Sequence, residues 1–208
     1  MDADPVEIRV LGCLIEKQRT TPDVYPLSLN ALRSACNQTT NRQPVVDYDE
    51  ATIRRGLERL ARRRWVRLAS GAGSRAAKYR HLLDEALGVS DPEIALLCVL
   101  MLRGSQTAGE LKQRSERLHP IHSLDEIHES LGRLVGRELA EQLPRRPGQK
   151  EERYVHSLGG DEAGELESLP PDRASSGPDD RLEAVEERVA RLERELALLR
   201  EAVAWRQD

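Results

Sequence analysis

The chain contains an internal repeat, and this repeat limits the folds that its 208 residues can adopt. The stretch EIRVLGCLIEK (7–17) resembles EIALLCVLMLR (93–103) at an offset of 86 residues. Further along, IRRGLERLARRRWVRLASGAGSRAAKYRHL (53–82) resembles IHESLGRLVGRELAEQLPRRPGQKEERYVHSL (127–158), at an offset of 74 residues at its start and 75 near its end. The sequence therefore predicts two copies of one small structural unit, of which the first has about twelve extra residues before residue 53.

Each copy has the pattern of three helices. Helical spacing of apolar residues predicts a first helix around Ile8, Leu11, Leu14 and Ile15, and around Ile94, Leu97, Val99 and Leu100. Ser28 and Thr107 are the expected N-caps of the second helices. The third helices place on one face Ile53, Leu57, Leu60 and Ala61, or Ile127, Leu131, Leu134 and Val135. Capping boxes are expected from Asp47 with Glu50 and from Ser123 with Glu126.

A β-hairpin follows the third helix of each copy. WVRLAS (65–70) and AKYRHL (77–82) flank one Gly-containing turn, and LAEQLP (139–144) and ERYVHSL (152–158) flank the other. Three helices and a hairpin are the order of a winged helix-turn-helix. The predicted fold class is therefore mainly α with small β-hairpins: tandem winged helix-turn-helix domains, at residues 1–87 and 88–158, plus a C-terminal coiled-coil helix.

The end of the chain has a different composition. Residues 159–178 are rich in Gly, Pro, Ser and acidic residues, which predicts a flexible linker. A coiled-coil helix is predicted at 179–207 from an a/d heptad seam of Leu182, Val185, Val189, Leu192, Leu196, Leu199 and Val203. Arg and Glu at its e and g positions favour a parallel homodimer. The alternative is a helix that folds back on its own domain.

Several long stretches resemble the YceH-like family of bacterial proteins. They are EKQRTTPDVYPLSLNALRSACNQTTNRQPVV (16–46), LASGAGSRAAKYRH (68–81), MLRGSQTAGEL (101–111) and RRPGQKEERYVH (145–156), which together cover both repeats. The resemblance implies tandem winged-helix domains and no known activity.

Positive charge is concentrated in the first repeat. Residues 1–88 have fifteen Lys and Arg against eleven Asp and Glu, whereas residues 159–208 have seven against fourteen. On the third helix of the first copy, several arginines lie opposite the apolar face, where a helix-turn-helix protein contacts DNA. The predicted DNA-binding residues are Thr52, Arg55, Arg59, Arg62, Arg63, Arg75, Lys78, Gln38, Asn41 and Arg42. The alternative for this face is an ordinary solvated surface.

The polar stretch SACNQTTNRQPV (34–45) is the expanded turn between the second and third helices of the first copy. Asn37 is expected to cap the second helix in a left-handed conformation. We expect the stretch to be mainly a loop tied by its own hydrogen bonds, with contact to a DNA backbone as the alternative. Cys36 continues an apolar face and is not expected to be a nucleophile.

The second copy has a weaker case for DNA binding. Its third helix has Asp125, Glu129, Arg133 and Gly136 on the corresponding face, and basic residues return only in its hairpin, at Arg145, Arg146 and Lys150. We expect this domain to pack or to bind a protein partner. The alternative function for the whole chain is accordingly a winged-helix protein–protein assembly factor without DNA binding.

No motif predicts an enzyme, a cofactor or a metal site. His119, His122 and His128 lack the compact paired spacing of a zinc site. The longest apolar run, IALLCVLML (94–102), is too short to cross a membrane, and the first ten residues do not resemble a secretory signal. Three widely spaced cysteines agree with a reducing compartment, so a cytoplasmic protein is expected.

Overall fold

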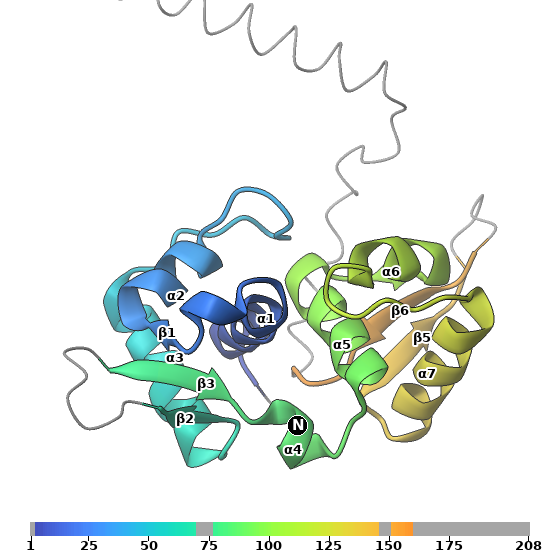
Figure 1. Cartoon of the computed structure of the whole chain (residues 1–208). Helices are drawn as coiled ribbons and strands as arrows, with labels where there is room; N and C mark the ends of the chain where they lie inside the picture. Colours follow the sequence, from blue (N-terminus) through green and yellow to red (C-terminus); the bar gives the residue numbers. More distant parts are fainter. Residues whose placement is uncertain (1–2, 70–76, 146–150, 160–208) are drawn as a thin grey trace, which may run out of the picture. The chain divides into compact units, whose positions relative to one another are not determined.

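The computed structural model describes residues 3–69, 77–145 and 151–159. The chain divides into two units, Met1–Ser168 and Leu169–Asp208, and the described residues all belong to the first. They form a mainly helical structure with small antiparallel sheets (Figure 1). The predicted coiled-coil helix, with its whole heptad seam, and the predicted linker beyond residue 159 lie outside the described residues.

The two repeats share one order of three helices and three strands, to which the first repeat adds a 3-10 helix and a short final helix. The first repeat has α1 (Pro5–Thr20), η1 (Pro22–Val24), β1 (Leu27–Ser28), α2 (Leu29–Cys36), α3 (Glu50–Arg62), β2 (Val66–Leu68), β3 (Lys78–His81) and α4 (Leu83–Leu87). The second has α5 (Asp91–Arg103), β4 (Gln106–Thr107), α6 (Ala108–Ser115), α7 (Leu124–Gly136), β5 (Ala140–Leu143) and β6 (Arg153–His156). The sheets have the strand orders β1-β3-β2 and β4-β6-β5, both antiparallel.

The starting residues of these elements confirm the repeat. Helices α1 and α5 begin 86 residues apart, α2 and α6 begin 79 apart, and α3 and α7 begin 74 apart. Seven of the twelve extra residues of the first repeat therefore lie before α2, where η1 forms, and five lie between α2 and α3. The two-residue strands β1 and β4 are not predicted by the sequence, because two residues are too few to show a strand pattern.

Side-chain caps start most of the helices, although not always the expected ones. Ser28 and Thr107 cap α2 and α6 as predicted. The box of Asp47 with Glu50 is wrong, because α3 begins at Glu50 and Asp49 accepts the hydrogen bond from Thr52 N. Ser123 accepts from Glu126 N, but the Glu126 carboxylate bonds to His122 N rather than completing a box.

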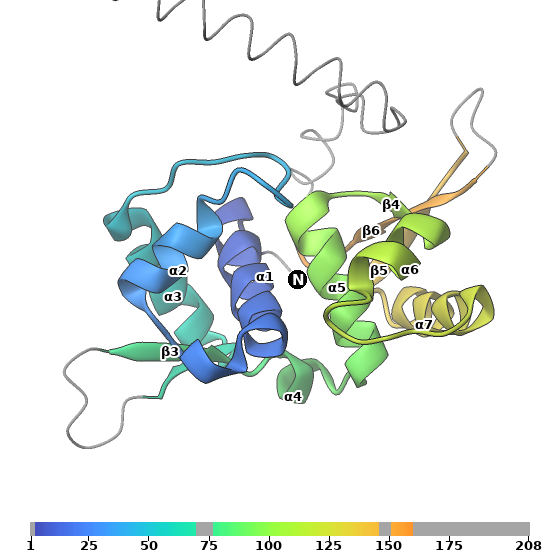
Figure 2. The ribbon, with the colours of Figure 1, turned by 45° about the horizontal axis from the view of Figure 1, so that its top comes forward.

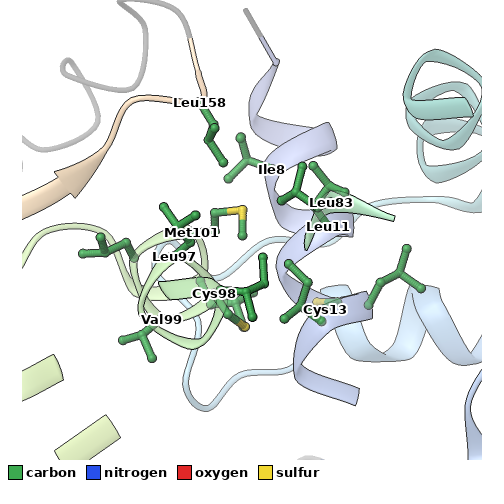
Figure 3. Close-up of a cluster of buried hydrophobic side chains, with 14 of the residues drawn as sticks. Ile8, Leu11, Cys13, Leu83, Leu97, Cys98, Val99, Met101 and Leu158 are labelled. Atoms are coloured by element: carbon green, nitrogen blue, oxygen red, sulfur yellow. The ribbon is translucent and has the colours of Figure 1, made fainter. Parts of the chain in front are cut away.

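Helix α1 occupies the middle of the core. Every residue from Glu7 to Ile15 is buried, because α1 packs on α2 and α3 on one side and on α5 on the other (Figure 2). The close approach of α1 and α5 depends on Gly12, where a Cβ atom would lie 2.8 Å from the Leu102 side chain. Ile8, Leu11, Leu97 and Met101 fill the same interface (Figure 3). Within the described ranges, no helix has the length and apolarity needed to cross a membrane.

Candidate nucleic-acid interface

The outward face of α3 has the composition that the sequence predicts. Ile53, Leu57 and Leu60 are buried in the core, while Arg55 and Arg62 are exposed on the opposite side. Arg55 donates a hydrogen bond to Thr52 Oγ1 at 3.0 Å, the two residues lying one turn apart. Arg62 forms no ion pair with any residue that the structure describes.

Two of the predicted DNA-binding arginines of α3 contact α1 instead of facing away from the core. Arg59 donates to the Asp4 carboxylate, and its Nε lies 3.7 Å from Glu7 Oε2. Arg63 Nε lies 3.7 Å from Glu7 Oε1, and its guanidinium stacks over the Trp65 ring at 5.5 Å. Glu7 is only 1% exposed, so these two arginines supply the positive charge that a buried carboxylate requires.

The second repeat has a related arrangement, in which the pair of buried glutamate and arginine recurs but the second arginine has a different partner. Glu93 is buried and accepts from Arg133 Nε at 2.7 Å, and Arg137 donates to the carbonyl oxygens of Leu87 and Gly88 at the end of α4. At the offsets of 86 and 74 residues, Glu93 corresponds to Glu7, and Arg133 and Arg137 correspond to Arg59 and Arg63. We call each set a Glu–Arg clamp. Arg59 and Arg133 hold the third helix on the first in their repeats, and Arg137 holds α7 on the end of α4, so these arginines have a structural role.

A second group of arginines does not recur. We use the name exposed arginine set for four side chains on helices and strands of the first repeat that are exposed and form no ion pair with a described residue: Arg33 on α2, Arg55 and Arg62 on α3, and Arg67 on β2. Their counterparts in the second repeat are Lys112, Glu129, Gly136 and Glu141. Arg33 and Arg67 are absent from the residues predicted from sequence, although aligning the two repeats would have singled them out.

Two members of the exposed arginine set, Arg33 and Arg55, help to lower the pKa of Asp49 at the start of α3. The hydrogen bonds from the Thr52 side chain and backbone, followed by the charges of Arg55 and Arg33, hold the pKa of the exposed Asp49 carboxyl below its ordinary value. Arg33 and Arg55 therefore lie near the same point although they come from different helices. Lys78 is exposed on β3, and the predicted contact residue Arg75 lies outside the described residues.

The burial of Arg42 does not favour the predicted DNA contact. Its side chain has no exposed surface. Its guanidinium donates to both oxygens of Glu16, at 3.1 and 2.5 Å, and to Gln38 Oε1 at 2.8 Å. It also donates to the carbonyl oxygens of Ala35 and Asn41. Burial raises the pKa of Glu16, but the Arg42 guanidinium outweighs it and holds this pKa below its ordinary value.

Residues 37–48, which we call the clasp segment, connect the two repeats. Asn41 Oδ1 accepts a hydrogen bond from Arg103, and Gln43 N donates to Leu102 O at 2.8 Å, so the segment reaches α5 (Figure 2). The buried Arg9 of α1 also contacts this region, because it donates to the carbonyl oxygens of Cys36 and Pro44. This polar stretch is thus tied down by protein contacts.

The conformation of the clasp segment differs from the expectation in one respect. Asn37 does end α2, but with φ −93°, so the predicted left-handed conformation is wrong. Its side chain instead donates to Tyr48 O and accepts from Tyr48 N, both at 2.9 Å. Asn41 is the residue with positive φ, 60°.

Cysteines and histidines are the residue types that would form a reactive thiol or a metal site. Cys13, Cys36 and Cys98 are buried, and the hydrogen bond with Cys13, together with burial, raises the pKa of Cys36 far above its ordinary value. Among the described residues, no three His, Cys, Asp or Glu side chains are grouped so that they could hold a metal ion. A shallow hollow lies beside the second Glu–Arg clamp, and its Ser90, Glu93 and Arg133 already bond to one another or to neighbours.

The comparisons with known proteins agree on one family. The model described as "Protein of unknown function, DUF480" matches residues 3–149. A UPF0502 protein of Pelobacter propionicus is 48% identical over 204 residues, which cover 95% of this chain and 93% of that protein. One from Geotalea uraniireducens is 47% identical over 205 residues, covering 96% and 91%, and one from Azotobacter vinelandii is 49% identical over 170 residues, covering 82% and 74%. The chain therefore belongs to the bacterial DUF480 family, in agreement with the resemblance to YceH-like proteins.

Proposed function

We propose that the chain is a double-stranded DNA-binding protein of regulatory or chromosome-associated type, with two winged helix-turn-helix repeats, that acts as a dimer. The observation that carries this proposal is the exposed arginine set. Four exposed arginines without ion pairs to described residues occur on helices and strands of the first repeat, and the second repeat has two acidic residues, a glycine and one lysine at the same positions. The fold tolerates those other residues, so packing does not require the arginines.

The order of elements supports the winged-helix interpretation. The helices common to both repeats are three, and the last two strands of each repeat form a hairpin that pairs with a short strand before the second of these helices. In helix-turn-helix proteins the second helix of the motif lies in the major groove. Under this proposal, α2 and α3 are the two helices of the motif in the first repeat, and α3 is the one that enters the groove.

The spacing of the arginines suits a duplex. Arg55 and Arg62 are seven residues apart, which is about two helical turns and about 10 Å along the axis, so both point to the same side of α3. An arginine can bond guanine bidentately or bind a phosphate group. Under this proposal, Arg55 and Arg62 face the groove, and Arg33, Arg67 and Lys78 contact the backbone. Arg59 and Arg63 act indirectly, by holding α3 in place.

Dimer formation is assigned to the predicted C-terminal coil, and the second repeat is proposed to bind a protein partner or to support the first. The seam from Leu182 to Val203 is long enough for a two-stranded coil. Deleting residues 179–208 is then expected to convert a dimer into a monomer in sedimentation equilibrium. A full-length chain that is already monomeric at micromolar concentration would contradict the dimer.

The test of DNA binding is an electrophoretic mobility shift with genomic fragments at two salt concentrations. Wild-type protein is expected to bind duplex DNA, and R55A/R62A to bind it more weakly, with a log–log salt slope smaller by about 0.9 for each phosphate that the variant no longer neutralises. The matched control is K112A/R117A, which removes two positive charges from the second repeat and is expected to change binding little. Absence of binding by the wild type at low salt would contradict the proposal.

A second candidate function is protein–protein assembly through the winged helices without DNA binding. It is favoured by the outward face of α7, where Asp125 and Glu129 are exposed and Leu124 is 47% exposed. A wild-type chain that binds no DNA, together with an R55A/R62A variant of unchanged stability, would favour this candidate.

A further inference from the structure

Glu58 is a carboxylate surrounded by arginines with which it does not pair. It is exposed on the outward face of α3. Arg54 and Arg55 precede it by four and three residues and Arg62 follows it by four, the spacings at which side chains of a helix form ion pairs. Arg54 pairs with Glu50 and Arg55 donates to Thr52, while Glu58 forms no ion pair with any described residue.

Packing does not explain this carboxylate. The counterpart of Glu58 in the second repeat is Gly132, and a Cβ atom there would meet no atom within 4 Å. The position therefore faces open space, and the fold accepts a residue without a side chain. The Glu–Arg clamp lies on a different side of α3, where Arg59 and Arg63 point to α1.

Binding to phosphate does not explain it either. A phosphate group has no hydrogen-bond donor for a carboxylate and repels its charge, so a surface that only contacts phosphates would bind more strongly without Glu58. A base pair differs, because cytosine presents its N4 amino group as a donor in the major groove and Glu accepts from it. Beside that cytosine, the guanine of the same or a neighbouring pair presents two acceptors, which Arg bonds bidentately.

We infer that Glu58 is a specificity-determining residue that selects a C·G base pair in the major groove. This inference rests on the proposed DNA-binding function. The outward face of α3 then places one acceptor, Glu58, between two donors, Arg55 and Arg62. Such a face matches a G·C-containing sequence and gives the carboxylate the donor that it does not find among the described residues.

The test is selection of duplexes from a random pool by the full-length protein, carried out with wild type, E58Q and E141Q. Glutamine keeps the size of the side chain and removes the charge. Glu141 is exposed on β5, forms no ion pair with a described residue, and controls for the change in net charge. Wild type and E141Q are expected to enrich the same motif with an invariant C·G pair. E58Q is expected to lose on the order of tenfold of its discrimination at that pair and to bind non-cognate duplex more tightly.

Two different failures can be told apart. If the wild type retains no duplex at low salt, the proposed function is wrong and the role of Glu58 falls with it. If the wild type binds duplex but E58Q enriches the same motif with the same discrimination, DNA binding stands and the role of Glu58 is overturned. Melting temperatures of the variants, expected to be unchanged, show that an altered motif does not come from altered folding.

Discussion

The two repeats share a skeleton and differ in their surface, and the difference separates structural residues from candidate functional ones. The Glu–Arg clamps built on Glu7 and Glu93 recur at corresponding positions, as do the buried histidines His81 and His156. Arg55 and Arg62 are replaced by Glu129 and Gly136. Two copies of one fold in one chain thus act as a control for each other: a residue present in both belongs to the shared fold, and an exposed residue found in a single copy is a candidate for another role.

The largest expected effect concerns the recurring histidines. Burial lowers the pKa of His81 to about 4, as it does the pKa of His156, against an ordinary value of 6.5. The unfolded chain therefore binds protons more readily, and stability that is complete above pH 6.5 is lost as the pH falls toward 4. The loss is on the order of 3 kcal/mol for each histidine.

Urea unfolding measured between about pH 7 and pH 4.5 checks this prediction. The window lies above the range in which carboxyl groups with lowered pKa, such as Glu16 and Glu93, take up protons. H122Q, at an exposed position, is the control and is expected to keep the wild-type profile. A free energy of unfolding that stays constant over this window would show that the two histidines are not buried as neutral groups.

The next effect belongs to a feature that only the first repeat has. R42A leaves the largely buried Glu16 carboxylate with only Lys17 as an ion-pair partner and removes five hydrogen bonds, so the free energy of unfolding is expected to fall by about 3 kcal/mol. The second repeat has Ala95 and Leu102 in place of Arg9 and Glu16 and lacks the clasp segment. R33A, at an exposed position nearby, is the control and should change stability by less than about 0.5 kcal/mol. Equal stability of R42A and R33A would refute the structural role of Arg42.

The clamp arginines are expected to have a smaller and parallel effect in both repeats. R59A and R133A each remove a partner of a buried glutamate, and each is expected to lower the free energy of unfolding by about 1–2 kcal/mol. R62A removes no such partner and should change it by less than about 0.5 kcal/mol. If R62A destabilises the protein as much as R59A, the division into structural and exposed arginines is wrong.

Most of the fold could be predicted from the sequence, because periodicity and the repeat are local signals. The order of three helices and a hairpin, the N-caps Ser28 and Thr107, and the apolar faces of α3 and α7 are confirmed. Details that depend on a choice between neighbouring residues are wrong, such as Asp47 instead of Asp49 as the cap of α3 and Asn37 instead of Asn41 as the left-handed residue. Both members of each pair have the same chemistry, and only the path of the chain distinguishes them.

The candidate site is harder to predict, because the partner of a charged side chain can lie far away in sequence. Helical periodicity places Arg59 on the polar side of α3, but Asp4 lies 55 residues before it and becomes its partner only in the folded chain. Arg42 has the sequence context of a surface residue in a polar stretch, and its burial depends on Glu16, 26 residues away on α1. Comparing the repeats at each position would have recovered part of this information, since Arg59 recurs as Arg133 and Arg62 does not recur.

The central claim is that DNA binding resides in the arginines that the second repeat lacks, and exchanging residues between the repeats tests it most directly. R55E/R62G gives α3 the residues that α7 already has at those positions, so the fold is expected to tolerate the change. The dissociation constant for duplex DNA, measured at two salt concentrations for wild type and variant, is expected to rise on the order of a hundredfold at low salt, with a smaller salt slope. An unchanged dissociation constant, with circular dichroism showing an intact fold, would contradict the claim.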